Sequence, residues 1–176
     1  MELVFLHGPP AVGKLTVAQK LGTLIPARVM DNHATIDLAL KVFDFGTAEF
    51  WDLVYQLRLA MLDAAARSDL PYLITTACYA HPQDLPIVEG REDVMLSLAA
   101  ALKPVHLTCP PTVLAERVVS AERGARGKIN TVQGLNAYLA RNAFVPLPRP
   151  GCLVLNTETL SPDQAANEIA LWLSRP

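Results

Sequence analysis

The chain has 176 residues, of which 51% are hydrophobic and 18% are charged, and its formal net charge at pH 7 is −2. This length and composition predict a single domain, residues 1–176, with a substantial core, and they exclude a disordered chain. A net charge so close to zero also excludes an overall basic surface that would bind nucleic acid or anionic lipid. We therefore expect neither nucleic acid nor a membrane as a partner.

Short apolar runs alternate with segments of helical periodicity along the whole chain. The runs that we expect to form strands cover residues 3–6, 28–30, 72–76, 105–109 and 153–155. The segments that we expect to form helices cover residues 13–24, 34–43, 48–67, 92–102 and 112–123, with a final helix from 162. Apolar strands separated by helices are typical of a parallel sheet that is covered on both faces. The fold class is therefore predicted to be α/β, a three-layer α/β/α sandwich around a five-stranded parallel sheet.

A glycine-rich loop, Gly8-Pro9-Pro10-Ala11-Val12-Gly13-Lys14-Leu15-Thr16, lies between the first strand and the first helix. Glycine permits a tight turn, successive backbone N–H groups can point inward, and the helix N-terminus adds partial positive charge. This context predicts a phosphate-binding loop in which Lys14 bridges the β- and γ-phosphates. The alternative is an ordinary glycine turn with a surface lysine. The residues expected to contact nucleotide are Gly8, Pro10, Ala11, Val12, Gly13, Lys14, Leu15 and Thr16.

The position directly after the lysine departs from the usual motif, which has Ser or Thr there as a magnesium ligand. Here Leu15 holds that position and Thr16 follows. The shifted hydroxyl resembles the Gly-Lys-Gly-Thr loop of the adenylate kinases, with leucine in place of the third glycine. In that family the threonine meets phosphate, and magnesium is held largely through water and substrate. The resemblance implies phosphoryl transfer to a small molecule, with ATP or GTP and Mg²⁺ as cofactors, and Thr16 and Asp31 facing the metal.

Polar residues follow the second strand as Asp31-Asn32-His33. Loops at the carboxyl ends of parallel strands converge on one ligand crevice, where an aspartate can bind magnesium through water or accept a proton from a hydroxyl. This order resembles the shikimate kinases, which place an aspartate here. The resemblance implies a catalytic and substrate-binding Asp31, with His33 as a polar contact. The alternative for Asp31 is a helix cap, and one residue can serve both purposes.

The acceptor is expected to lie against residues 31–67, with further contacts from the end of the third strand. In related small-molecule kinases an arginine on the helix at 48–67 reaches an anionic group of the acceptor, which implies that role for Arg58. Its alternative is a surface arginine whose stem packs on the helix. Thr76 and Tyr79 can hydrogen-bond an acceptor or simply pack at the strand end. The carboxylate that usually ends this strand in motor-type ATPases is absent from it.

The basic residues concentrate in one segment. Residues 117–149 hold six Arg or Lys against one acid, so this segment carries +5 and the rest of the chain −7. The glycines in 117–134 predict a flexible lid, and the resemblance implies that Arg117, Arg123 and Arg126 close over the triphosphate and exclude water. The alternative is a solvated basic helix end. The resemblance also implies that Asn156 and Thr157 meet the nucleotide base.

The three cysteines are far apart in the sequence, which favours free thiols in a reducing, cytoplasmic setting over disulfides. The first residues carry no basic segment, so we expect no secretory signal. Taken together, the chain resembles a shikimate kinase-like or chloramphenicol phosphotransferase-like P-loop protein. We expect an ATP-binding kinase, monomeric or homodimeric, that transfers the γ-phosphoryl group to a small hydroxyl-bearing acceptor. The alternative is a regulatory or resistance module that binds nucleotide without transferring phosphate.

Overall fold

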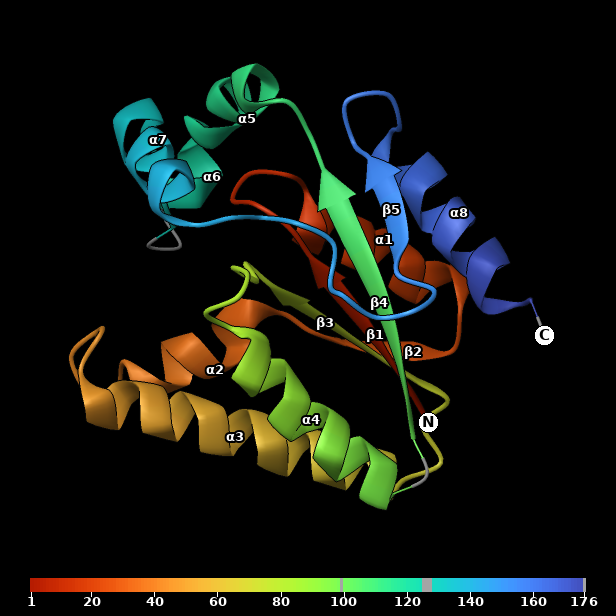
Figure 1. Cartoon of the computed structure of the whole chain (residues 1–176). Helices are drawn as coiled ribbons and strands as arrows, with labels where there is room; N and C mark the ends of the chain where they lie inside the picture. Colours follow the sequence, from red (N-terminus) through yellow and green to blue (C-terminus); the bar gives the residue numbers. More distant parts are fainter. Residues whose placement is uncertain (99, 125–127, 176) are drawn as a thin grey trace.

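The computed structural model of the protein describes residues 1–98, 100–124 and 128–175. A five-stranded sheet runs through its centre in the order β2-β3-β1-β4-β5, and every adjacent pair is parallel (Figure 1). The strands are β1 (Glu2–His7), β2 (Ala27–Met30), β3 (Tyr72–Ala77), β4 (Ala101–Thr108) and β5 (Leu153–Asn156). The predicted five-stranded parallel sheet is confirmed.

Helices cover both faces of this sheet. They are α1 (Lys14–Leu24), α2 (Asn32–Ala39), α3 (Ala48–Ala66), α4 (Leu85–Ser97), α5 (Pro111–Val118), α6 (Ala121–Gly124), α7 (Val132–Arg141) and α8 (Pro162–Leu173). Figure 1 shows α1 and α8 together on one face and α3 and α4 on the other, while α5, α6 and α7 lie beyond the carboxyl ends of the strands. None of the helices in the described residues is long and apolar enough to cross a membrane.

The central strand β1 explains why two helical layers form. Successive side chains of a strand point to opposite faces, so an unbroken apolar strand feeds two cores. Val4 and Leu6 are buried with Leu21 of α1 and Ile169 of α8. Leu3, on the other face, is buried with residues of α3 and α4. Each core holds its helices against the sheet, and the loops at the strand ends are thereby fixed.

The helix expected at 112–123 is divided into α5 and α6, and two further differences from the sequence prediction concern α4 and α7. The helix expected at 92–102 begins at Leu85 and ends at Ser97, and β4 takes over from Ala101. The apolar run there is shared by a helix and a strand, and periodicity alone does not separate the two. The second difference is α7, whose residues 132–134 fall inside the segment that we expected to be flexible. Thr131 caps α7 by accepting a hydrogen bond from the Gly134 amide, and Leu135 is fully buried.

Candidate active site

The glycine-rich loop leaves β1 at the carboxyl edge of the sheet and leads into α1, the context that the sequence predicted. Gly8 and Gly13 have φ values of 146° and 96°, in the range that favours glycine. A Cβ on Gly8 would meet the backbone oxygen of Leu107 in the neighbouring strand. Glycine is therefore required at position 8 both by backbone conformation and by the close approach of β4.

The Lys14 side chain folds back onto the glycine-rich loop and binds its backbone. Its Nζ donates hydrogen bonds to the carbonyl oxygens of Gly8 and Pro9, at 2.8 and 2.7 Å, and to the Cys78 sulfur at 3.3 Å. Burial lowers the pKa of Lys14, while the neighbouring Cys78 raises it. The ammonium is thus held at the centre of the loop, where successive backbone amides and the start of α1 also favour an anion.

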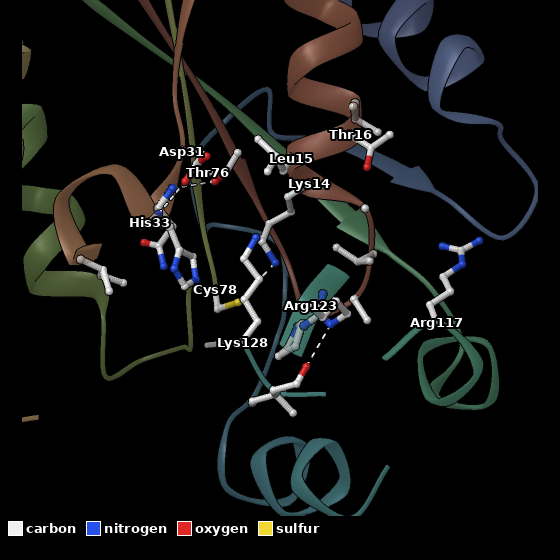
Figure 2. A pocket seen from close by; sticks show the side chains of 18 of the residues that line it. Lys14, Leu15, Thr16, Asp31, His33, Thr76, Cys78, Arg117, Arg123 and Lys128 are labelled. Atoms are coloured by element: carbon white, nitrogen blue, oxygen red, sulfur yellow. Dashed lines mark hydrogen bonds between the residues drawn. The ribbon is translucent and has the colours of Figure 1, made fainter. Parts of the chain in front are cut away.

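A cavity of about 730 Å³ opens beside the loop and extends in both directions from it. Figure 2 shows Asp31 and His33 on one side of Lys14 and Arg117 on the other, with Cys78, Arg123 and Lys128 near the lysine. All of these residues line the cavity. The structure therefore gathers carboxylate, lysine and arginine side chains from distant parts of the sequence into one space.

The carboxylate end of the cavity is built on the start of α2. The Asp31 carboxylate caps this helix by accepting a hydrogen bond from the His33 amide at 2.6 Å. The Asn32 amide donates to the Thr76 hydroxyl at 3.0 Å, which ties the start of α2 to β3. The His33 ring lies 3.2 Å from the Asp37 carboxylate. Asp31 is therefore a helix cap that also lines the cavity, and its catalytic and substrate-binding role stays a prediction.

Two residues expected to touch the acceptor lie elsewhere. Arg58 is not among the residues that line the large cavity, and its guanidinium donates to Thr35 at 3.0 Å and to the Asn32 side chain at 2.8 Å. Tyr79 is 1% exposed, and its hydroxyl lies 2.7 Å from the ring of His81, away from the cavity lining. Arg58 therefore lies against α2, outside the lining of the large cavity, and Tyr79 is buried in the core.

The opposite end of the cavity is fixed by Thr157, which is buried after β5. Its hydroxyl donates to the Val12 carbonyl of the glycine-rich loop at 3.0 Å. The Arg117 guanidinium donates to the Thr157 hydroxyl at 3.1 Å and to its carbonyl at 2.8 Å. Asn156 does not line the cavity, and its side chain instead accepts from the Glu158 amide at 2.9 Å. Of the two residues expected at the base, only Thr157 faces the cavity.

The basic segment supplies the remaining charge. Arg123 lines the cavity, and its Nε donates to the Ile129 carbonyl at 2.9 Å. Burial lowers the pKa of Arg123, and Cys78 raises it. Lys128 also lines the cavity. Arg126 lies outside the described residues. The structure therefore places Arg117 and Arg123, from separate helices, over the same space.

No protein-family model matches the sequence, and no curated protein matches it either. Solved structures do match the fold. A sugar kinase from Janibacter has a TM-score of 0.67 at 19% identity, with 98% of this chain and 94% of that chain covered. The tunicamycin resistance protein of Deinococcus radiodurans has a TM-score of 0.67 at 18% identity, with 99% and 96% covered. The APS kinase of Mycobacterium tuberculosis, solved with AMPPNP and APS, has a TM-score of 0.66 at 17% identity, with 99% and 98% covered.

The chain has the P-loop kinase fold. The resemblance drawn from the glycine-rich loop and the order of the motifs is confirmed at the level of fold. The match covers nearly the whole length of each chain, so this P-loop kinase fold includes α5, α6 and α7 as well as the sheet.

Several cavity residues of this P-loop kinase fold escaped the sequence analysis. Cys78 follows β3 where a carboxylate is usual, and its position one residue past the strand is the signal that could have placed it at the cavity. Phe45 and Trp51 line the cavity although they are 65% and 44% exposed. Tyr138 reaches it from α7, a helix that was not predicted. Their roles depend on how α2, α3 and α7 pack, which the sequence pattern does not reveal.

Proposed function

We propose that this protein is a kinase that transfers the γ-phosphoryl group of a nucleoside triphosphate to a hydroxyl group of a small acceptor. The observation that carries the proposal is the large cavity with Lys14 and Arg123 near its middle, Arg117 toward one end and the Asp31 carboxylate at the other. A phosphoryl donor and a proton acceptor are the two groups that such a transfer must bring together.

Each group has a distinct part in the proposed step. Lys14 and the loop amides bind the β- and γ-phosphates, and Arg117 and Thr157 adjoin the base end of the nucleotide. The acceptor oxygen bonds to the γ-phosphorus, the bond from that phosphorus to the β,γ-bridging oxygen breaks, and the nucleoside diphosphate leaves. The hydroxyl proton passes to Asp31. Arg123, and Arg126 of the proposed lid at 117–134, stabilise the charge on the moving group.

Magnesium accompanies nucleotide in this proposal. The Thr16 hydroxyl and the Asp31 carboxylate both line the cavity, and hydroxyl and carboxylate oxygens are donors that suit Mg²⁺. Bound there, the ion would neutralise phosphate charge. Leu15 also lines the cavity, but its hydrocarbon side chain offers the ion no donor.

The acceptor end of the cavity favours an uncharged acceptor with an apolar face. Ile36, Leu40, Phe45 and Trp51 line this part of the cavity, and the rings of Phe45 and Trp51 lie 5.6 Å apart in a T-shaped contact. The carboxylates of Asp31 and Asp37 face the same space, and they would repel an anionic acceptor. Exposed aromatic side chains beside a cavity are typical of a binding surface.

A turnover assay with a panel of hydroxyl compounds tests the kinase proposal. Wild-type protein should form phosphorylated product, and Lys14→Ala should reduce its formation by at least about 100-fold, because electrostatic stabilisation of the transferring group is lost. Lys20→Ala is the matched control, since Lys20 lies on the exposed side of α1 in an ion pair with Asp163. Equal turnover by the Lys14→Ala variant would contradict the proposal.

A nucleotide-binding module is the second candidate. Leu15 in place of a hydroxyl residue and Cys78 in place of a carboxylate favour it. Calorimetric titration with ATP, ADP and GTP, performed beside the turnover assay, separates the two candidates. Binding without product from any acceptor in the panel would support the module.

A further inference from the structure

A second, much smaller cavity lies behind α2, with a volume of about 20 Å³. Thr75 of β3, Arg58 of α3 and Arg91 of α4 line it. Asp31, Asn32 and Thr76 line both cavities, so the small one is separated from the acceptor end only by the start of α2. The proposed kinase activity makes no use of this space.

One hydroxyl in this cavity has no hydrogen-bond partner. The Thr75 side chain is buried, with 8% of the residue exposed, and its Oγ1 atom makes no hydrogen bond to any described residue. Leaving a buried hydroxyl without a partner costs about 1–3 kcal/mol. The Thr75 hydroxyl therefore lacks an acceptor that a particle bound in this cavity would supply.

Two guanidinium groups share the same space. Arg58 is held by Thr35 and Asn32. Arg91 lies 5.7 Å from the ring centre of Phe5, and among the described residues it has no hydrogen-bond partner. Burial and the neighbouring Arg91 lower the pKa of Arg58 to about 10, which Asp84 partly offsets. Positive charge is thus concentrated where the hydroxyl lacks an acceptor.

We propose that the small cavity binds a monatomic anion of the size of chloride. The Thr75 hydroxyl and the guanidinium N–H groups are all donors, and a halide ion accepts from several donors at once. A volume of about 20 Å³ suits a particle the size of a water molecule or slightly larger, so a monatomic ion fits it better than phosphate, sulfate or a carboxylate ligand. Water would also satisfy the Thr75 hydroxyl. The Asp31 carboxylate lines the cavity and the charge of Asp84 acts on both arginines, but among the described residues neither Arg58 nor Arg91 forms an ion pair, so an anion would add charge compensation that water does not supply.

The bound anion would stabilise the start of α2. Arg58 holds the Asn32 side chain, and the Asn32 amide is held by Thr76 next to the unpartnered Thr75. Asp31, which precedes them, faces the large cavity. Occupancy of the small cavity would therefore fix the backbone that presents the Asp31 carboxylate to an acceptor.

Thermal unfolding of the full chain tests this proposal without reference to kinase activity. Melting temperatures are compared in potassium chloride and potassium gluconate at equal ionic strength and pH, and then in potassium bromide. Wild-type protein should melt a few degrees higher in chloride, with saturation as chloride rises, because an ion that binds only the folded state stabilises it. Bromide should act in the same way.

Variants and anomalous scattering locate the ion. Thr75→Val removes the hydroxyl without changing the shape of the side chain, and it should abolish the chloride-dependent shift. Thr23→Val, at an exposed hydroxyl that bonds to the Lys20 carbonyl, should keep the shift. Crystals grown in bromide should give an anomalous peak between Thr75 and Arg91. Equal melting of wild-type protein in chloride and gluconate, a shift that survives in Thr75→Val, or a cavity without an anomalous peak would each overturn the proposal.

Discussion

Gly8 occupies the one position in the glycine-rich loop where both backbone and neighbours exclude a side chain. Its φ is 146°, and an added Cβ would meet the Leu107 carbonyl of the adjacent strand. Gly46 also has a positive φ, 91°, but an added Cβ would meet nothing within 4 Å. Substituting Gly46 therefore tests backbone strain alone, whereas substituting Gly8 tests backbone strain together with a steric clash.

We expect Gly8→Ala to destabilise the protein by about 3 kcal/mol or more, because strain and overpacking add. Gly46→Ala should cost only about 1 kcal/mol, since strain acts alone. Urea unfolding followed by circular dichroism measures both changes. Equal losses from the two variants would show that the approach of β4 to the loop is unimportant.

Two buried histidines lie beneath the loop. His7 and His106 are 0% and 3% exposed, and their Nδ1 atoms are 3.4 Å apart. Burial, with the neighbouring His106 and Lys14, lowers the pKa of His7 to about 3. Burial, with Lys14, lowers the pKa of His106 to about 4. Both rings are therefore neutral in the folded protein at neutral pH.

This pair predicts a loss of stability in mild acid. Below the unfolded-state pKa of about 6.5, the unfolded chain binds protons that the folded rings do not, so the free energy of unfolding falls as pH drops toward 4. Each histidine should contribute up to about 1.4 kcal/mol per pH unit. Urea midpoints between pH 7.5 and 4.5 measure the slope. His106→Asn should reduce it, and an unchanged slope would show that this histidine is not the source.

At the level of elements, Arg58 fastens α3 to the start of α2. Its three hydrogen bonds end on Thr35 and Asn32, and none of them reaches into the large cavity. Since the start of α2 presents Asp31, we infer that Arg58 is a positioning residue for the acceptor end. A direct contact with an acceptor, as the resemblance implied, is not needed for this role.

We expect Arg58→Met to raise the KM for the acceptor about 10-fold or more while leaving nucleotide affinity within about 2-fold, because the loop around Lys14 is unaffected. Arg67→Met is the matched control, at an exposed arginine on the same helix paired with Asp63. Steady-state kinetics and calorimetry with an ATP analogue give the two numbers. A parallel loss of nucleotide affinity would place Arg58 in a different role.

The sequence predicts those elements whose conformation depends on residues close together in the chain, and it misses those that depend on tertiary packing. The place of the glycine-rich loop between β1 and α1 was predicted, because Gly8 and Gly13 mark a turn that only a few residue types can form, whereas its contacts with nucleotide stay a prediction. The beginning of α4 was missed, since residues 85–91 depend on packing against α3 rather than on a strong apolar period. The partnership of Arg58 with Asn32 was also out of reach, because it joins residues 26 positions apart through the packing of two helices.

For the whole molecule, the separation of charge predicts how salt affects nucleotide binding. Residues 117–149 carry +5 against −7 for the rest of the chain, and Arg117, Arg123 and Lys128 line the cavity. Binding of ATP should weaken as ionic strength rises, and binding of ADP should weaken less because ADP carries less charge. Calorimetric titrations in potassium gluconate between about 50 and 300 mM ionic strength measure both trends, because the Debye length shortens across this range. An equal dependence for ATP and ADP would contradict this expectation.

The Thr157 side chain has a consequence for nucleotide length. Because its hydroxyl is bonded to Val12 and to Arg117, the spacing between the phosphate loop and the opposite end of the cavity is constant. In the proposed kinase, a nucleotide whose base lies near Arg117 would project its phosphate chain by a distance that depends on the number of phosphates. The terminal phosphoryl group of a triphosphate would then extend toward Asp31, whereas that of a diphosphate would stop one phosphate short. The protein would thus distinguish the nucleoside triphosphate from the nucleoside diphosphate by the length of the phosphate chain, without a side chain that contacts only one of them.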